Sequence, residues 1–385
     1  MYQIKLLNKI AAAGTDRFDP ARYAVSSDIE TPDAILVRSA AMHDMTFPPE
    51  LKAIARCGAG VNNIPVDRCA EEGIVVFNTP GANANGVKEL TVAALLLASR
   101  NIIGGVEWAS GLTENVAKAV EAGKSAYGGT EIKGKTLGVI GLGAIGGLVA
   151  NAAKSLGMNV VGCDPYLTVD AAWGLSSSVK KAATYEEVYA VSDYITIHVP
   201  ATKETKGFIN KDSIAQMKRG VKIINLARAD LVNAADLKEA LASGQVSAYV
   251  TDFPTEETVG VPGIITIPHL GASTEESEEN CAVMAADQVM DFLENGNIKN
   301  SVNYPAVDMP RTDAGRLVIL HRNIPNMISH VASTLAERKI NIENMANRSR
   351  GDFSVMLVDT YAEITADMQT TIESMEGIIK VIVIR

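Results

Sequence analysis

The segment TLGVIGLGAIG, residues 136–146, constrains the fold more than any other part of the chain. Gly141, Gly143 and Gly146 form a GxGxxG pattern directly after an apolar run and before a helical segment. The first glycine permits a tight turn, the second lets the backbone approach a pyrophosphate, and the third lets helix and strand pack closely. Free N–H groups at the helix start would face that anion. The pattern therefore predicts a strand–turn–helix unit that binds a dinucleotide.

An acidic residue follows at the position that contacts the ribose in such units. The next apolar run, NVVGC, is followed directly by Asp164, 18 residues past Gly146. A carboxylate there bonds both ribose hydroxyls and repels a 2′-phosphate, so it favours NAD over NADP. A glycine-rich turn without a ligand would not account for the strand, the helix and the acid together.

Short apolar runs rich in β-branched residues alternate with helical stretches over the first 300 residues. They begin at Tyr2, Ala34, Lys52 and Ile74, and in a second series at Thr136, Asn159, Tyr194, Val221 and Ile264. Runs without polar alternation suit strands buried on both faces, and their alternation with helices predicts an α/β fold with parallel sheets. We expect two doubly wound domains: a Rossmann-type NAD domain at 92–271 and a flavodoxin-like substrate domain at 1–91 and 272–301. Two helices, one from Glu89 and one over Ser273–Glu294, would connect them.

The C-terminal region has a different pattern. Residues 302–314 contain two prolines and several turn formers, which predicts a linker. Within 315–385 we expect strand RLVILH, a helix over Asn326–Arg338, strands near Ile340 and over Phe353–Thr360, a helix near Met368–Met375 and strand IIKVIVIR. This βαββαβ order predicts a small ferredoxin-like unit.

Charge and cysteine usage exclude several functional classes. The 385 residues carry a net charge of −10 without any basic run, which argues against nucleic-acid binding, and an anionic substrate would need local cations. Four isolated cysteines favour neither a disulfide framework nor a metal site. The start, MYQIKLLNKI, lacks a signal-peptide core, and no apolar run approaches the ~20 residues of a membrane helix. We expect a cytoplasmic protein.

Three segments at strand ends carry residues suited to hydroxy-acid oxidation. They are NLARAD with Arg228, FPTEE with Glu256 and PHLGAS with His269. His269 could take a hydroxyl proton, Glu256 could orient its ring and raise its pKa, and Arg228 offers a planar fork for a carboxylate. Taken singly, an Arg is more often a surface cation, a Glu a solvated acid and a His a packing residue. Spacing alone does not separate these interpretations.

Several motifs in order resemble one known family. RCGAGVNNIP from Arg56, NTPGAN from Asn78, GKTLGVIGLGAIG from Gly134 and IHVPATKET from Ile197, with the three segments above, are similar to the D-isomer-specific 2-hydroxyacid dehydrogenases. The resemblance implies that Arg228, Glu256 and His269 form the catalytic group. It also implies the cofactor contacts, which are Gly141, Gly143, Ala144, Ile145, Gly146, Asp164, His198, Val199, Pro200, Thr205, Ala227, Asp252 and Gly271.

One departure concerns Asp252. The family usually has Asp-X-Phe where this chain reads TDF, so Asp252 is displaced by one position.

On the substrate side, the resemblance implies that backbone N–H groups of Gly58, Ala59 and Gly60 hold the carboxylate. Arg38, Ser39 and Arg56 match residues that bind the anionic end of the substrate.

The substrate expected from the resemblance is 3-phosphoglycerate, oxidised in the first step of L-serine biosynthesis. Other hydroxy acids of the 2-hydroxyglutarate, glyoxylate or lactate type stay open, because the stretch AGKSAYGGTEIKGK before the glycine motif is poor in cations. A non-catalytic NAD-sensing corepressor is a further alternative. Retention of all three acid–base and charge-binding residues argues against that alternative.

The C-terminal unit resembles an ACT domain. His321, Asn323 and Asn341 match polar residues that hold serine in regulated relatives, so L-serine is a candidate effector. Where that pattern has a glycine, this chain has Asn326, and a pairing domain without ligand is the alternative. Because ACT units usually pair side by side, we expect a homodimer or homotetramer.

Overall fold

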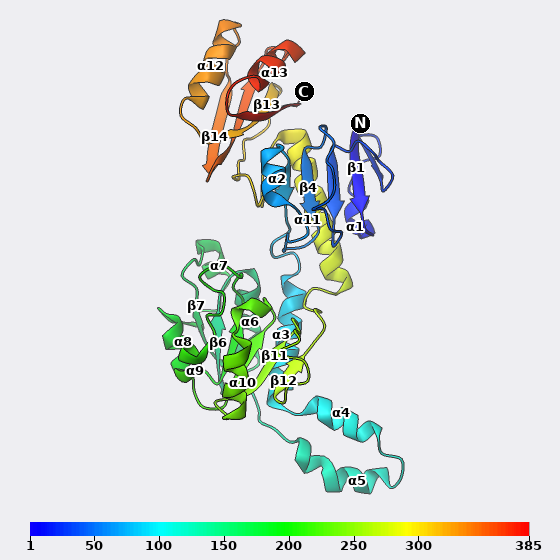
Figure 1. The fold of residues 1–385 in the computed structure, drawn as a ribbon, viewed down its shortest axis with the longest axis vertical. Coiled ribbons are helices and arrows are strands. Elements are labelled where there is room, and N and C mark those ends of the chain that lie inside the picture. The colour runs from blue at the N-terminus through cyan, green and yellow to red at the C-terminus, as the bar shows by residue number, and fades with distance from the viewer. Residues whose placement is uncertain (385) are drawn as a thin grey trace. The chain divides into compact units, whose positions relative to one another are not determined.

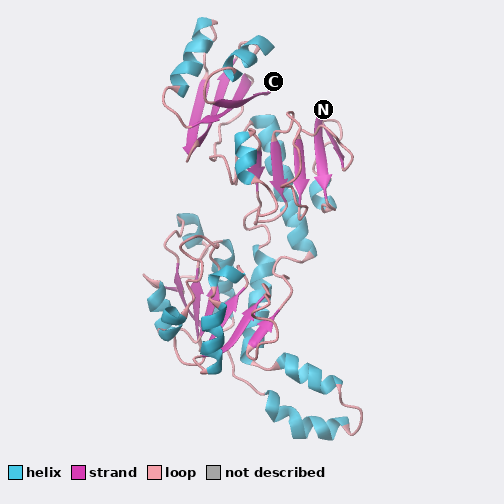
Figure 2. Ribbon diagram, viewed as in Figure 1, coloured by secondary structure: helices cyan, strands magenta, loops and turns pink. Residues whose placement is uncertain are grey.

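A computed structural model describes residues 1–384, so Arg385, the last residue of the predicted C-terminal unit, lies outside it. The chain divides into two compact units. One comprises Met1–Asn83 together with Glu275–Arg385, and the other comprises Ala84–Thr274. Figures 1 and 2 show that each unit is built on its own sheets with flanking helices.

The first unit contains a five-stranded parallel sheet in the order β2-β1-β3-β4-β5. Its strands are β1 (Tyr2–Leu7), β2 (Tyr23–Ser26), β3 (Ala34–Val37), β4 (Ala53–Arg56) and β5 (Val75–Phe77), and its helices are α1 (Ala12–Thr15), α2 (Val66–Glu71) and α11 (Glu275–Asn295). The apolar runs of the sequence do not predict strand β2, because an edge strand is only partly buried and needs no long apolar run. Helix α11 packs on α1, where Gly14 lies directly against Ala282.

The second unit contains a seven-stranded parallel sheet in the order β12-β11-β10-β9-β6-β7-β8. Its strands are β6 (Thr136–Ile140), β7 (Asn159–Cys163), β8 (Lys180–Lys181), β9 (Tyr194–Ile197), β10 (Val221–Asn225), β11 (Val246–Thr251) and β12 (Ile264–Thr266). Its helices are α3 (Ala84–Ser99), α4 (Ile102–Ser110), α5 (Val116–Gly123), η1 (Lys124–Tyr127), α6 (Ala144–Ser155), α7 (Val169–Trp173), α8 (Tyr185–Val191), α9 (Lys211–Ala215), η2 (Ala229–Leu231) and α10 (Ala234–Ala242). The predicted α/β class with two parallel sheets is confirmed.

The end of the chain forms a four-stranded antiparallel sheet in the order β14-β15-β13-β16. Its elements are β13 (Gly315–Arg322), α12 (Met327–Glu337), β14 (Asn344–Arg350), β15 (Phe353–Thr360), α13 (Ala366–Glu373) and β16 (Ile378–Ile384). The predicted βαββαβ order is confirmed. The strand expected near Ile340 begins only at Asn344, because Ile340 and Ile342 pack into the core from a loop.

Both faces of this antiparallel sheet are covered. Helices α12 and α13 cover one face, and the other joins the core of the first unit, where Val318 and Leu357 lie against Gly296 just after α11. The segment 302–314 packs along the same unit, with the Tyr304 hydroxyl donating to the Ala70 carbonyl at 2.7 Å. Its position is therefore fixed by burial and hydrogen bonds.

A buried ion pair fastens this sheet to the rest of its unit. The side chains of Arg316 and Asp359 are 0% exposed, with Nε 2.6 Å from Oδ1 and Nη2 2.9 Å from Oδ2. The guanidinium also donates to the carbonyl of Asn295, at the end of α11, and to those of Met309 and Pro310. One side chain thus connects β13, β15, α11 and the connecting segment.

Within residues 1–384, no helix has the length and apolarity needed to cross a membrane. Over the same residues, no group of three or more His, Cys, Asp or Glu side chains is placed to bind a metal ion.

We predict that Asp359→Asn lowers the free energy of unfolding of this unit by about 3–5 kcal/mol, because a buried guanidinium loses its counterion. Urea unfolding followed by circular dichroism measures the change. The matched control is Asp367→Asn in the same unit, which removes one partner of the exposed Arg338–Asp367 pair and should shift stability by less than about 1 kcal/mol. Equal midpoints for Asp359→Asn and the unmodified chain would contradict this account.

Candidate functional site

The glycine turn between β6 and α6 has the geometry of a dinucleotide-binding turn. Gly141 has φ +88°, and a Cβ there would lie 2.6 Å from the His198 carbonyl oxygen. A Cβ on Gly146 would lie 1.9 Å from the Gly141 oxygen, so helix and turn pack with no room for a side chain. At Gly143 a Cβ would meet nothing within 4 Å, which leaves open space in front of the backbone. No side chain caps α6, so its first N–H groups, from Ala144 and Ile145 on, are available to an anion.

Asp164 lies beside this turn at the end of β7. Its Oδ2 accepts the Leu142 N–H at 2.8 Å, and its Oδ1 accepts the Tyr166 N–H at 2.9 Å. Each carboxylate oxygen keeps a second lone-pair direction. The carboxylate is therefore fixed in orientation and retains acceptor capacity for two hydroxyl groups.

The end of the neighbouring strand β9 completes this side of the site. His198 follows β9, and its backbone N–H donates to Ile140 at 2.8 Å, next to the glycine turn. Its Nε2 lies 2.9 Å from the Thr196 hydroxyl, and burial lowers the pKa of His198 to about 4, so the ring is neutral near pH 7. Val199 contacts Gly141, and the Thr205 hydroxyl donates to the Pro200 carbonyl at 2.6 Å. The predicted cofactor residues near β6, β7 and β9 are thus brought together.

The three predicted acid–base and charge-binding residues follow three adjacent strands. Arg228 comes after β10, Glu256 after β11 and His269 after β12, and these strands are neighbours in the sheet. Because the strands are parallel, all three residues emerge at the same carboxyl edge, where ligands bind in such sheets. Among residues 1–384, no hydrogen bond or ion pair links Glu256 to His269. Glu256 instead lines a cavity of about 320 Å³ with Phe253 and Thr258.

Two residues that sequence analysis did not single out position this group. The Phe253 ring centroid lies 4.5 Å from that of His269, and the Arg228 guanidinium carbon lies 5.5 Å from the same ring. Asn225 is fully buried; its Oδ1 accepts the N–H groups of Ala227 and Arg228, and its Nδ2 donates to the Arg228 carbonyl at 2.8 Å. An Asn at a strand end, three residues before the arginine, was the available signal for this role.

Asp252 is buried between β11 and β12 despite its displaced position in the sequence. Its Oδ2 accepts the Gly271 N–H at 3.0 Å, and its carbonyl accepts the His269 N–H at 2.9 Å. Burial raises the pKa of the Asp252 carboxyl, opposed by the Gly271 bond and by the positive charges of His269 and Arg228. Among the described residues nothing donates to its buried Oδ1. This oxygen is an unused acceptor at the carboxyl edge, which an amide N–H of a ligand would satisfy.

The predicted substrate residues lie at strand ends of the first unit. Arg38 and Ser39 follow β3, Arg56 ends β4, and Val37 pairs with Arg56 in the sheet register. Gly58 has φ +149°, and a Cβ there would lie 1.2 Å from Nη1 of Arg56, so the glycine leaves room for the guanidinium. Ala59 and Gly60 continue this loop, where the Ala59 carbonyl accepts from Asn78 at 2.7 Å.

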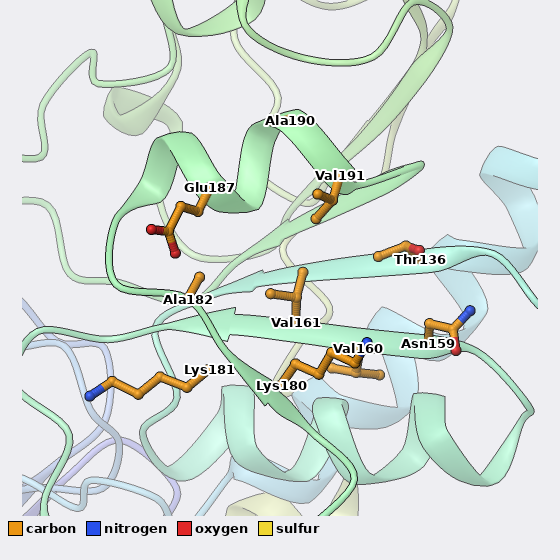
Figure 3. Close-up of a pocket in the computed structure, with 10 residues that line it drawn as sticks. All are labelled: Thr136, Asn159, Val160, Val161, Lys180, Lys181, Ala182, Glu187, Ala190 and Val191. Atoms are coloured by element: carbon orange, nitrogen blue, oxygen red, sulfur yellow. The ribbon is translucent and has the colours of Figure 1, made fainter.

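A cavity of about 640 Å³ lies elsewhere in the same unit. Its walls include Thr136 and Asn159, the first residues of β6 and β7, so it lies at the amino end of strands whose carboxyl ends carry the glycine turn. Figure 3 shows helix α8 over these strands, with Glu187 and Val191 projecting from it. This cavity is therefore separate from the cofactor edge.

In the C-terminal sheet, the predicted effector residues bond within the protein. His321 is buried, with Nδ1 2.8 Å from the Arg322 carbonyl and Nε2 3.0 Å from Oδ1 of Asn347. Asn323 donates to the Gly351 carbonyl, and Asn341 donates to Glu343. Asn326 has φ +68°, the left-handed conformation that a glycine would favour and that Asn tolerates. The substitution at this position therefore preserves the backbone turn before α12.

Comparison with known proteins places this geometry in a family. Residues 92–271 match the model described as D-isomer specific 2-hydroxyacid dehydrogenase, NAD binding domain. The D-3-phosphoglycerate dehydrogenase of Bacillus subtilis is 38% identical over 293 residues, which cover 73% of this chain and 53% of the relative. That of Mycobacterium leprae is 33% identical over 367 residues, covering 90% of this chain and 67% of the relative. This chain therefore spans 53% and 67% of the lengths of these curated relatives.

Solved structures of dehydrogenases have a similar fold. The NAD⁺-bound 3-phosphoglycerate dehydrogenase of Entamoeba histolytica has a TM-score of 0.62 and 27% identity, covering 78% of this chain and 98% of its own. The apo D-mandelate dehydrogenase of Rhodotorula graminis has a TM-score of 0.67 at 21% identity, covering 81% and 99%, and supports the fold alone. This chain belongs to the D-isomer specific 2-hydroxyacid dehydrogenases and carries their NAD-binding domain.

Proposed function

We propose that the protein is an NAD-dependent dehydrogenase that oxidises 3-phosphoglycerate to 3-phosphohydroxypyruvate, the first step of L-serine biosynthesis. The observation that carries this proposal is the arrangement of Arg228, Glu256 and His269 at one carboxyl edge of the NAD-binding domain. The names of the Bacillus and Mycobacterium relatives support the choice of substrate.

Each residue of this group has a task that its chemistry supports. Bound NAD⁺ supplies the acceptor for the hydride that leaves C2 of the hydroxy acid. His269 takes the proton of the C2 hydroxyl, and Arg228 holds the substrate carboxylate and the C2 oxygen in its planar fork. Glu256 approaches His269 when substrate is bound and stabilises the imidazolium, because catalytic hydrogen bonds often tighten only in the complex. Phe253 restricts the imidazole and guanidinium to one geometry, and Asp252 accepts the nicotinamide amide.

The first unit supplies the cations that an anionic substrate requires. Arg38 follows β3 and Arg56 ends the adjacent strand β4, and the glycines of the loop at 58–60 let backbone N–H groups approach a carboxylate. On a chain with a net charge of −10, such a local pair of arginines favours an anionic end group over a neutral one.

The substrate assignment predicts a ranking of oxo acids. With NADH, 3-phosphohydroxypyruvate should give a higher kcat/KM than 2-oxoglutarate, glyoxylate or pyruvate, because only it places a dianion beside the arginines. Absorbance at 340 nm measures each rate. Preference for another oxo acid would discard the phosphate assignment and keep the dehydrogenase. Absence of turnover with all four would favour the NAD-sensing alternative.

The role of His269 predicts that His269→Ala lowers kcat by roughly 10²–10⁴, the usual contribution of a general base. Binding of NADH, followed by its fluorescence, should be unchanged. His330→Ala, an exposed histidine of α12, is the matched control and should keep full activity. Near-normal turnover of His269→Ala would remove this residue from the mechanism.

We also propose that the protein is a homo-oligomer formed through the arm of α4 and α5. Figure 1 shows this arm projecting from the NAD-binding unit, and neither helix has a buried residue. Ile102, Val106 and Val116 are 43%, 59% and 48% exposed. Helices of nine and eight residues are marginal in water unless they pack on something. A second copy of the chain provides a symmetric partner for this apolar surface.

The arm predicts that Val106→Glu disrupts assembly, because it places a charge at the centre of the apolar surface. Light scattering should give the mass of one chain for this variant and a multiple for the unmodified protein. The control is Glu107→Gln on the same helix, which should keep the larger mass. A monomeric unmodified protein would contradict the proposal.

For the C-terminal sheet, the βαββαβ order supports an ACT domain. Serine binding at His321, Asn323 and Asn341 stays a prediction, as does the cytoplasmic location.

A further inference from the structure

One of the two arginines proposed to bind the substrate forms an ion pair with an acidic residue of the protein itself. Nη2 of Arg38 lies 2.5 Å from Oε1 of Glu278, which projects from the first turn of α11. Both side chains are close to 40% exposed, so the pair faces solvent and a small anion has access to it. In a cation site meant for a dianion, an internal carboxylate is an opposing charge.

The position of Arg38 is fixed by a separate contact. Asn8, with φ +77°, directs its Oδ1 at three consecutive backbone N–H groups, those of Arg38, Ser39 and Ala40, at 3.4, 3.0 and 2.9 Å. This side chain satisfies the turn after β3 internally. Arg38 therefore leaves the strand from a rigid base, and its guanidinium is held between that base and Glu278.

Arg56 belongs to the same neighbourhood. It ends β4 opposite Val37, the residue before Arg38. The two arginines therefore leave adjacent strands at the carboxyl edge of this sheet, and Glu278 is held against Arg38.

We propose that Glu278 is a specificity-determining residue that sets the charge of the pocket for the distal group of the substrate. With Glu278 ionised, its negative charge opposes the positive charge of Arg38. A dianionic distal group then gains less from Arg38 than it would without Glu278, while a neutral distal group is unaffected. This inference rests on the proposed function, because it assigns the arginine side of that same site.

The test compares Glu278→Gln with Glu279→Gln, which removes the same charge from the next, exposed residue of α11. The substrates are pyruvate, 2-oxoglutarate and 3-phosphohydroxypyruvate, whose distal groups carry charges of 0, −1 and −2. For Glu278→Gln we expect KM to fall about three- to tenfold for the phosphorylated acid, less for 2-oxoglutarate and not at all for pyruvate, with kcat unchanged. Exposed ion pairs have effects of this order, and salt should reduce the difference.

A second experiment measures ligand binding directly, so that the effect of charge is separated from effects on folding and on turnover. Calorimetric titration with D-glycerate and 3-phospho-D-glycerate at saturating NADH compares two ligands that differ only in the phosphate. Glu278→Gln should strengthen binding of the phosphorylated ligand alone, and it should do so only when Arg38 is present, so the gain should vanish in the Arg38→Gln background. Equal changes for both ligands, weaker binding of the phosphorylated ligand, or the same gain for Glu279→Gln would overturn the proposal.

These outcomes are distinguishable from failure of the proposed function. If the unmodified protein prefers pyruvate or 2-oxoglutarate, the assignment of 3-phosphoglycerate fails. Both experiments still measure how the effect of Glu278→Gln depends on the charge of the distal group, because each ligand is compared with itself in two variants.

Discussion

The site depends on one constraint, the parallel pairing of strands β6 to β12 in a single sheet. Parallel strands carry all their carboxyl ends to one edge, so the glycine turn, Asp164, His198, Arg228 and His269 emerge on the same side without being near in sequence. The order of the strands then divides this edge of the sheet into two parts. The ends of β6, β7 and β9 form the part suited to phosphate and ribose, and the ends of β10, β11 and β12 form the part that carries acid–base groups.

The second part is organised by aromatic and amide contacts as well as by charge. Phe253 lies against both the His269 ring and the Arg228 guanidinium, and Asn225 fixes the backbone from which Arg228 projects. Glu256 is the exception, since it lines a separate cavity with Phe253 and Thr258. His269 is thus held by ring packing against Phe253 and not by a carboxylate.

The C-terminal sheet is firmly attached to its unit by burial on both faces and by the Arg316–Asp359 pair. Helix α11 begins six residues after His269 and ends at Asn295, whose carbonyl accepts from Arg316. The same helix carries Glu278, which pairs with Arg38. Helix α11 therefore contacts Arg316 of the antiparallel sheet at its last residue and Arg38 of the parallel sheet in its first turn.

The sequence by itself determined the α/β class, the glycine turn with Asp164 and the βαββαβ end, because each rests on local patterns: apolar runs, turn glycines and helix periodicity. It did not reveal strand β2 or the true start of β14, since partly buried edge strands and loop isoleucines carry no distinct pattern. Only the tertiary structure decided which charges meet. Arg38 and Glu278 are 240 positions apart, and Arg316 and Asp359 are 43 apart, so their pairing follows from how strands and helices pack. Side-chain contacts between distant segments depend on that packing, and no local pattern of residues encodes them.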